Sequence, residues 1–350
     1  MICNHFLLLS NQEFFSIIIN LIFALVFLFL LCFKLSLSYL NSDMTKFDVT
    51  GLGSLAVDFI GSIKKWPAAG TKNGLKNFDI FDGGLTGTAL TTVARLGGHV
   101  AYIGKKGNSE MAERSMKSLE KEGIDLSMLT SDPDSEPIIA VVFSSPDQGE
   151  RNIFFQKENL RFPFPDEIPD KQWFKKTKVF FTDHVAGEAG VMAARIALDA
   201  GVEVVVDIER IQENTDALLE AASHIVVGER FAREYSGSHK YADQVKALRK
   251  KDFQKVIITY GEKGSRFSKN GSVTNVSGFR VNVIDTTGCG DVFHGAYALA
   301  VARNYPAEKA LLYANAAAAI KAQYMGGRPG IPTKEKLDGF LKDNEVVNVI

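Results

Sequence analysis

The chain has 350 residues, of which 46% are hydrophobic and 23% are charged, and its formal net charge is −1 at pH 7. This composition is that of a globular protein with one large core or two smaller ones. The near-neutral balance argues against a protein that binds nucleic acid, which usually carries a strong basic excess. The cysteines are Cys3, Cys32 and Cys289, so the chain from residue 44 onward holds a single thiol and no internal disulfide. A reducing, cytoplasmic compartment fits this cysteine usage best.

The first 43 residues form a hydrophobic leader, in which the run from Phe14 to Phe33 carries no charge. This run is about long enough to span a bilayer as a helix, so a membrane anchor is one interpretation. A cleaved signal peptide is disfavoured, because the run is too long and no small-residue cleavage site follows. We favour a mis-annotated start, since Met44 opens a sequence typical of a soluble N-terminus. If residues 14–33 are an anchor, Lys34 and Glu13 on its flanks place the rest of the chain in the cytoplasm.

From residue 44 onward, short apolar segments alternate with amphipathic ones. The apolar segments predict strands at Phe47–Gly51, Val100–Ile103, Lys178–Thr182, Val202–Asp207, His224–Val227 and Val256–Tyr260. Helical spacing predicts helices at Thr86–Leu96, Met111–Glu122, Ala189–Ala200, Ala217–Ala222, Ala242–Lys250, Val292–Ala302 and Ala307–Tyr324. Continuous apolar strands separated by helices indicate a mostly parallel sheet that is covered by helices on both faces. The expected fold class is therefore α/β.

Two segments interrupt this alternation. Residues 57–82 contain Pro67 and several glycines and show no helical period. Residues 137–157 read as two paired strands, Ile138–Ser144 and Arg151–Phe155. Strands without crossover helices predict a small antiparallel sheet that projects from the α/β body. Such a sheet could close over a ligand or pair with a second subunit, as in a homodimer.

A polar glycine-rich loop leads directly into the predicted helix Val292–Ala302. Gly288, Cys289 and Gly290 are followed at once by Asp291. Backbone N–H groups at a helix N-terminus can hold a phosphate group. A carboxylate at the same point would repel that anion. Its presence is explained if it takes a proton from a hydroxyl group that attacks the phosphate. The loop therefore predicts phosphoryl transfer, although Asp291 could also simply complement the helix dipole.

Two further loops are candidates for ligand contact. Gly83 and Gly84 precede the predicted helix Thr86–Leu96, and their backbone could contact a polyhydroxylated ligand. The sequence from Thr259 to Gly264 follows a strand, at the edge where open α/β sheets bind ligands. Each loop is also compatible with an ordinary turn or helix cap.

The pattern from Gly51 to Ala56 resembles a dinucleotide-binding fingerprint and raises an NAD-dependent oxidoreductase as an alternative. That fingerprint has to lie at the start of a helix. Here the sequence continues toward Pro67 and several glycines, which do not form a helix. We therefore discount this alternative. The histidines after residue 44 are scattered, and we predict no metal site formed by protein side chains alone.

Taken together and in this order, these segments resemble the ribokinase or PfkB family of carbohydrate kinases over essentially all of residues 44–350. The sequence from Asp285 to Asp291, DTTGCGD, matches the family's D-T-x-G-A-G-D motif, and the Gly-Gly loop, the T-x-G-x-x-G turn and the tail from Gly326 to Thr333 also fit. The resemblance implies a ribokinase-like three-layer α/β/α fold with a small β-sheet lid, formed by approximately 57–82 and 137–157.

The resemblance also implies roles for individual residues. Asp291 would be the catalytic base, and the amides of Gly288, Cys289 and Gly290 would form an anion hole. The implied sugar-binding residues are Asp58, Gly83, Gly84 and Thr88, and the implied nucleotide-binding residues are Thr259, Gly261, Gly264 and Asn315. Asp285 and Thr287 match positions that hold a monovalent cation in some members, so K⁺ is a candidate cofactor beside ATP and Mg²⁺.

Two departures from the family pattern concern the ligand sites. Thr88 stands where the family usually has Asn. The N-x-x-E element linked to Mg²⁺ and phosphate is not intact, and Glu229 is the candidate to replace it. Thr88 together with the Gly-Arg-Pro-Gly-Ile-Pro tail resembles the branch near sulfofructose kinase and ketohexokinase-like enzymes. The expected activity is ATP-dependent phosphorylation of a small-molecule sugar, with a catalytically silent sugar sensor on the same scaffold as an alternative.

Overall fold

The computed structural model describes residues 46–145 and 150–344. The chain divides into a unit of Met1–Lys46 and a unit of Phe47–Ile350, and the fold is that of the second unit. The predicted leader of residues 1–43, with its apolar segment 14–33, lies outside the described residues, as do residues 146–149 of the predicted segment 137–157. Within the described ranges, no helix combines the length and the apolar character needed to cross a bilayer.

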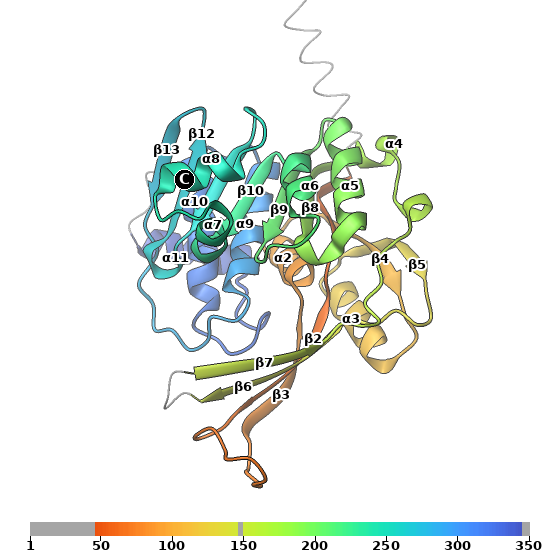
Figure 1. The fold of residues 1–350 in the computed structure, drawn as a ribbon, viewed down its shortest axis with the longest axis vertical. Coiled ribbons are helices and arrows are strands. Elements are labelled where there is room, and N and C mark those ends of the chain that lie inside the picture. Colours follow the sequence, from red (N-terminus) through yellow and green to blue (C-terminus); the bar gives the residue numbers. More distant parts are fainter. Residues whose placement is uncertain (1–45, 146–149, 345–350) are drawn as a thin grey trace, which may run out of the picture. The chain divides into compact units, whose positions relative to one another are not determined.

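A nine-stranded sheet forms the centre of the fold (Figure 1). Its strand order is β13-β12-β11-β10-β9-β8-β1-β4-β5, and all neighbours from β11 to β5 are parallel. The predicted mostly parallel sheet is therefore confirmed. Its strands are β1 (Phe47–Leu52), β4 (Val100–Lys106), β5 (Asp125–Ser131), β8 (Thr177–Asp183), β9 (Glu203–Ile208), β10 (His224–Gly228), β11 (Lys255–Thr259), β12 (Ser265–Lys269) and β13 (Ser272–Val276).

Three strands of this sheet were not predicted: β5 and β13 form its two edges, and β12 lies next to β13. An edge strand is half solvated, so it needs no continuous apolar run. The polar sequences DLSMLTS, SRFSK and SVTNV reflect that position. At one edge, β12 and β13 pair antiparallel, as strands joined by a short turn do.

Helices cover both faces of the sheet, which makes the predicted three layers. One face packs against α2 (Leu85–Arg95), α3 (Glu110–Lys121), α9 (Cys289–Ala302), α10 (Ala307–Lys321) and α11 (Lys334–Asp343). The other face packs against α4 (Lys171–Phe174), α5 (Gly187–Asp199), α6 (Thr215–Ala221), α7 (Glu229–Ser236) and α8 (Tyr241–Leu248).

Successive residues of the central strands point into these two cores in turn. Phe181 and Val205 pack in the first core, whereas Phe180, Val204 and Val206 pack in the second. All five side chains are fully buried. Because both faces of a central strand are buried, its sequence has to be continuously apolar, which is why these strands could be predicted.

A second sheet of four strands projects from this body (Figure 1). Its order is β3-β2-β6-β7, with β2 (Ala56–Ser62), β3 (Lys76–Gly83), β6 (Ile138–Ser145) and β7 (Glu150–Gln156). The predicted small sheet is confirmed, and its pairing is mostly antiparallel: β2 with β3 and β6 with β7 are antiparallel, whereas β2 and β6 pair in parallel. The chain between β2 and β6 runs through β3, α2, β4, α3 and β5 instead of through a turn. The sheet exposes apolar side chains at Leu75, Phe78, Ile153, Phe154 and Phe155.

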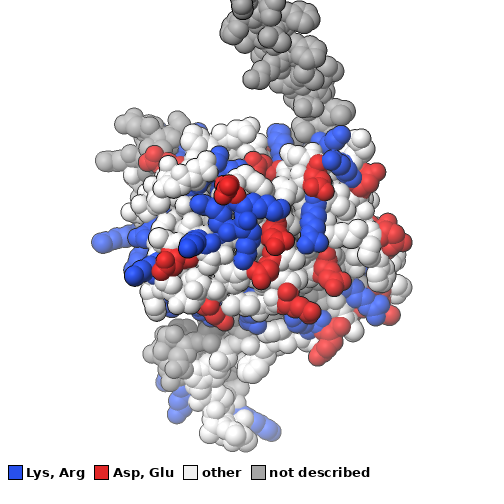
Figure 2. Space-filling model, turned by 45° about the horizontal axis from the view of Figure 1, so that its top comes forward, with Lys and Arg blue, Asp and Glu red and all other residues white. Residues whose placement is uncertain are grey.

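The surface carries charges of both signs. On the face seen in Figure 2, lysine and arginine side chains lie among aspartates and glutamates. A mixed surface of this kind gives no extended basic stripe on that face, in line with the net charge of −1.

Candidate active site

The glycine-rich loop forms the N-terminus of α9, as the sequence predicted. Gly288 is the N-cap with φ 75°, a left-handed conformation that favours glycine. A Cβ atom there would also lie 2.9 Å from the carbonyl oxygen of Gly327, so the loop and the tail approach each other closely. At Gly290 a Cβ atom would meet no other atom within 4 Å, which leaves open space beside the first turn of the helix.

The three predicted anion-hole amides are not equivalent. The Cys289 N–H donates to the carbonyl oxygen of Thr286 at 3.2 Å, within the turn itself. An incoming anion would have to share this N–H with that carbonyl. Gly288 and Gly290 therefore stay the stronger candidates to bind an anion at the positive end of the helix dipole.

Asp291 lies in the first turn of α9 with 9% of its surface exposed. Burial raises the pKa of Asp291 well above its usual range, and the negative charges of Glu209, Asp183 and Asp58 raise it further. The positive charge of Lys321 opposes this shift. A carboxylate with a raised pKa binds a proton more tightly than an exposed one, as a general base requires.

Asp58 of β2 lies beside the Gly83–Gly84 loop. A Cβ atom on Gly83 would be 2.2 Å from Asp58 Oδ2, so the carboxylate rests against the glycine backbone. Gly84 has φ 86°, and a Cβ atom there would lie 2.5 Å from Leu55 Cα. Burial raises the pKa of Asp58 to about 6, with Arg328 opposing and Asp82 adding to the shift. The structure therefore brings together Asp58, Gly83 and Gly84, and the charge of Asp58 acts on Asp291.

Thr88, in the first turns of α2, is almost fully buried, and its hydroxyl group has no hydrogen-bond partner among the described residues. A Cβ atom on Gly327 would lie 3.8 Å from this hydroxyl oxygen. Since Gly327 also contacts the Gly288 loop, the tail joins the two predicted binding loops at one place. A free, inward-facing hydroxyl at this junction is available for a ligand.

Arg328, which we did not single out from the sequence, is buried beneath the Gly83–Gly84 loop. Its Nη2 donates to the carbonyl oxygen of Gly83 at 2.6 Å, and its Nη1 donates to Ser118 Oγ at 3.0 Å. A Cβ atom on Gly87 would lie 2.2 Å from Nη2, so the guanidinium group needs glycine at that position. Burial lowers the pKa of Arg328 to about 10, which leaves it charged at neutral pH.

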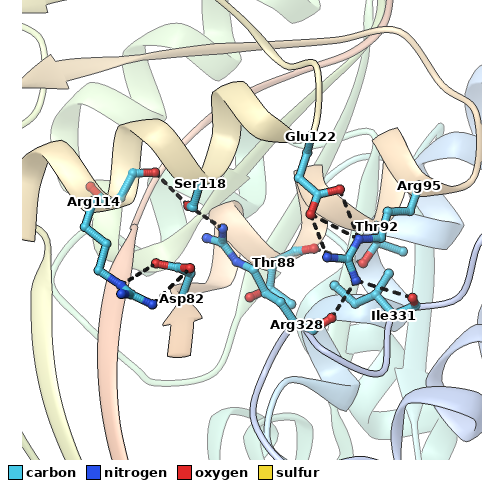
Figure 3. A network of polar contacts seen from close by, with 10 residues as sticks. Asp82, Thr88, Thr92, Arg95, Arg114, Ser118, Glu122, Arg328 and Ile331 are labelled. Atoms are coloured by element: carbon cyan, nitrogen blue, oxygen red, sulfur yellow. Dashed lines mark hydrogen bonds and ion pairs between the residues drawn. The ribbon is translucent and has the colours of Figure 1, made fainter. Parts of the chain in front are cut away.

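Two ion pairs flank this guanidinium group (Figure 3). Arg114 pairs with Asp82 at 3.0 Å, and Arg95 pairs with Glu122 at 2.6 Å. Arg95 also donates to the backbone oxygen of Arg328 at 2.8 Å. This network ties the end of β3 to α2, α3 and the tail, and it therefore fixes the base of the small sheet.

Asp183, at the end of β8, is a second residue that sequence reasoning missed. Its Oδ2 accepts hydrogen bonds from the N–H and hydroxyl groups of Ser54 and from those of Thr86, at 2.7 to 3.2 Å. Its Oδ1 accepts from the N–H groups of Val185 and Ala186. This fully buried carboxylate joins three loops at the C-terminal edge of the sheet. The sequence offered one indication of this residue, namely its position as a charged residue directly after a buried parallel strand.

A similar signal marks Asp207 at the end of β9, which pairs in register with Asp183. Neither carboxylate oxygen of Asp207 accepts a hydrogen bond from the described residues, and His294 Nε2 lies 3.4 Å from Oδ1. Burial raises its pKa well above the usual range, and the charges of Glu209 and Asp291 add to the shift. This edge of the sheet therefore gathers several buried carboxyl groups whose charges act on one another.

The predicted nucleotide-binding residues lie together at the other end of this edge. Thr259 ends β11, and Gly261 and Gly264 have φ values of 58° and 92° in the turn that follows. A Cβ atom on Gly264 would be 2.1 Å from the carbonyl oxygen of Val276. Asn315 of α10 donates to that same oxygen at 3.3 Å. Its amide group therefore supports the wall formed by the end of β13.

Glu229, the predicted Mg²⁺ and phosphate candidate, is the first residue of α7. Its carboxylate lies 3.9 Å from Arg233, and its charge acts on Tyr260 beside the Thr259 turn. The acidic residue whose charge acts most strongly on Asp291 is Glu209, after β9. Sequence reasoning missed Glu209, although it closely follows the predicted strand Val202–Asp207.

A hollow with a volume of about 1150 Å³ is lined by residues of 157–168, by α5 and by residues 212–217. None of the predicted site residues lines it.

We expect Asp58→Asn to stabilise the ligand-free protein at neutral pH. The folded-state pKa of about 6 exceeds the ordinary 3.8, so the folded state binds more protons than the unfolded state between these values. The contribution of Asp58 to the free energy of unfolding is complete below about pH 4 and is lost as the pH rises through about 6. The variant does not suffer this loss of stability, so its unfolding free energy should exceed the wild-type value by about 3 kcal/mol at pH 8. Urea unfolding from pH 4 to 8 measures the difference, and a variant less stable than wild type at pH 8 would contradict the raised pKa.

Comparisons with known proteins agree with this architecture. Residues 46–334 match the model of the pfkB family of carbohydrate kinases. Ribokinase of Haemophilus influenzae is 26% identical over 84% of this chain and 98% of its own length. The 5-dehydro-2-deoxygluconokinase of Shouchella clausii is 25% identical over 86% of this chain and 97% of its own length.

Two solved structures share the fold. Arabidopsis thaliana ribokinase, solved with ribose and ATP, superposes with a TM-score of 0.71 and 20% identity over 85% of this chain and 99% of its own. A protein designated ribokinase II from E. coli, solved with ATP and Mg²⁺, gives a TM-score of 0.72 and 20% identity over the same shares. The family match spans most of the chain, and the relatives are kinases of small sugars. The chain therefore belongs to the pfkB family of carbohydrate kinases.

Proposed function

We propose that this protein transfers the γ-phosphoryl group of ATP to a hydroxyl group of a small sugar, with Asp291 as the general base. The observation that carries the proposal is the position of Asp291. It is a buried carboxylate of raised pKa in the first turn of α9, next to open space at Gly290. A hydroxyl group held against Asp291 loses its proton to the carboxylate as its oxygen attacks phosphorus.

We propose the remaining roles for the residues that the family resemblance implies and that lie around Asp291. Asp58, Gly83, Gly84 and Thr88 would hold the sugar hydroxyl groups. Gly288 and Gly290, with a shared contribution from Cys289, would receive the negative charge of the transferring group. Thr259, Gly261 and Gly264 would border the nucleotide, with Asn315 supporting that wall.

A divalent cation that accompanies ATP fits the acidic character of this edge. Carboxylate oxygens and phosphate oxygens are the ligands that Mg²⁺ prefers. Glu229 stays the predicted candidate, and Glu209 and Asp207 are further carboxylates of this edge that could face the cation bound with ATP, since the described residues contain no cluster of three or more acidic, histidine or cysteine side chains that would hold a metal without it. When bound, Mg²⁺ neutralises charge on the phosphates.

The small sheet would act as a lid, approximately residues 57–82 and 137–157, that excludes water from the reaction. Its exposed apolar side chains, among them Phe78 and Phe154, also suit a homodimer formed through this sheet. We place the protein in the cytoplasm, and N-terminal sequencing of the native protein tests whether residues 1–43 form part of it.

The test is ATP turnover with a sugar panel of ketoses, their 6-sulfo and 6-phospho forms, ribose and nucleosides. A carbohydrate kinase consumes ATP and releases ADP only with an accepted sugar. A sensor on the same scaffold binds a sugar without turnover, and an oxidoreductase changes nicotinamide absorbance without ADP. The structure agrees with our rejection of the dinucleotide fingerprint, because Gly51–Ser54 leads into strand β2 and not into a helix.

A further inference from the structure

A lysine side chain is fully buried at the entrance to the glycine-rich loop. Lys321 is the last residue of α10 and has an exposed fraction of 0%. Its Nζ donates to the backbone oxygen of Asp285 at 2.9 Å. Lysine is almost never fully buried unless its charge is paired or bound, so this position requires a specific role.

The loop is docked on the C-terminal end of α10. The N–H groups of Ile284 and Asp285 donate to the carbonyl oxygen of Ala322 at 2.8 and 3.1 Å. The Gly326 N–H donates to Asp285 Oδ2 at 2.9 Å. A helix C-terminus carries partial negative charge, which favours a cation at this point. The Lys321 ammonium group is that cation.

The carboxylate of Asp285 is already engaged within the loop. Its Oδ1 accepts the N–H of Thr287 at 2.9 Å and the hydroxyl of Thr287 at 2.7 Å. Burial alone would raise the pKa of Asp285, but these donors and the charge of Lys321 hold it below its usual range. The group is therefore ionised, and the positive charge of Lys321 contributes to holding it so.

These contacts do not fit the potassium ion that the resemblance suggested for Asp285 and Thr287. A potassium ion binds through carbonyl and carboxylate oxygens that replace its water shell. The Asp285 carbonyl oxygen instead accepts a hydrogen bond from an ammonium group. A potassium ion beside this carbonyl oxygen would lie next to the fixed positive charge of the ammonium group and would be repelled by it.

We propose that the Lys321 ammonium group is the built-in monovalent cation of this loop, so that the enzyme works without potassium. The inference rests on the proposed kinase function and adds its cation requirement. The fixed charge holds the segment from Asp285 to Gly288 on α10. It also offsets the negative charges around Asp291, the base that has to be ionised before it accepts a proton.

The experiment compares kcat in potassium chloride and in choline chloride at constant ionic strength. Wild-type kcat should be the same in both salts. Lys321→Ala should lower kcat in choline by about a hundredfold, as expected when one electrostatic stabiliser is lost. Potassium or ammonium ions should then restore kcat of this variant with saturation, because the truncated side chain leaves room for an ion.

Two control variants separate charge from packing. Lys321→Met keeps the length of the side chain and leaves no room for an ion, so its loss of kcat should not respond to potassium. Lys121→Ala removes an exposed lysine from the last turn of α3 and should change nothing. A loss in Lys321→Ala that no monovalent ion recovers would reduce Lys321 to a packing role and overturn the proposal.

A second readout does not depend on activity. Potassium should raise the Tm of Lys321→Ala above its value in choline and should leave the wild-type Tm unchanged. A wild-type kcat or Tm that rises with potassium and saturates overturns the proposal, even if the alanine variant does not fold. Wild-type protein that turns over no sugar refutes the proposed function instead, and the Tm comparison still decides the role of Lys321.

Discussion

Asp291→Asn should reduce kcat by on the order of a hundredfold or more, which is the expected cost of losing a general base. The amide keeps the size of the side chain but cannot accept the proton of the sugar hydroxyl. KM for the sugar and for ATP should change little, because the substitution leaves the proposed binding loops unchanged. Steady-state kinetics with an accepted sugar provide the measurement.

The fold of this variant should be at least as stable as that of wild type. The substitution removes a buried charge that is repelled by Glu209, Asp183 and Asp58. A matched control is Asp252→Asn, which makes the same change at an exposed position and should leave kcat unaltered. Near-full kcat in Asp291→Asn, with wild-type Tm, would remove Asp291 from the role of base.

Asp183→Ala should have the largest effect on stability, lowering the free energy of unfolding by about 4 kcal/mol. The change leaves the buried N–H and hydroxyl donors of Ser54 and Thr86 without their acceptor. Each unsatisfied buried donor costs about 1–3 kcal/mol, and partial relaxation reduces the sum. Urea unfolding followed by circular dichroism measures the loss.

Asp170→Ala provides the matched control for this variant. Asp170 also accepts a backbone N–H, that of Trp173 at 2.9 Å, but it does so at an exposed helix N-cap. Loss of such a cap typically costs about 1 kcal/mol. If Asp183→Ala is no less stable than Asp170→Ala, the carboxylate does not hold the three loops together.

Much of the site could be predicted because its signals are local in sequence. Gly288 and Asp291 are three positions apart, and their residue types alone indicate a helix N-terminus with an adjacent carboxylate. Gly84 was equally predictable, since a left-handed turn before a helix favours glycine. The residues that support these loops were not predictable. Asp183 reaches Ser54, 129 positions away, and Arg328 reaches Gly83, 245 positions away.

The sequence alone was enough to predict the buried central strands, most of the longer helices, the mostly parallel sheet and the position of the glycine-rich helix start. Those features follow from residue spacing over a few turns or strands, because buried elements have to be apolar with a fixed period. Only the tertiary structure decided the parallel pairing of β2 with β6 and the meeting of Asp58, Asp291 and Lys321 at one edge. The charge and the proton affinity of these three side chains depend on which groups surround them once water is excluded. The packing of the whole chain decides those neighbours.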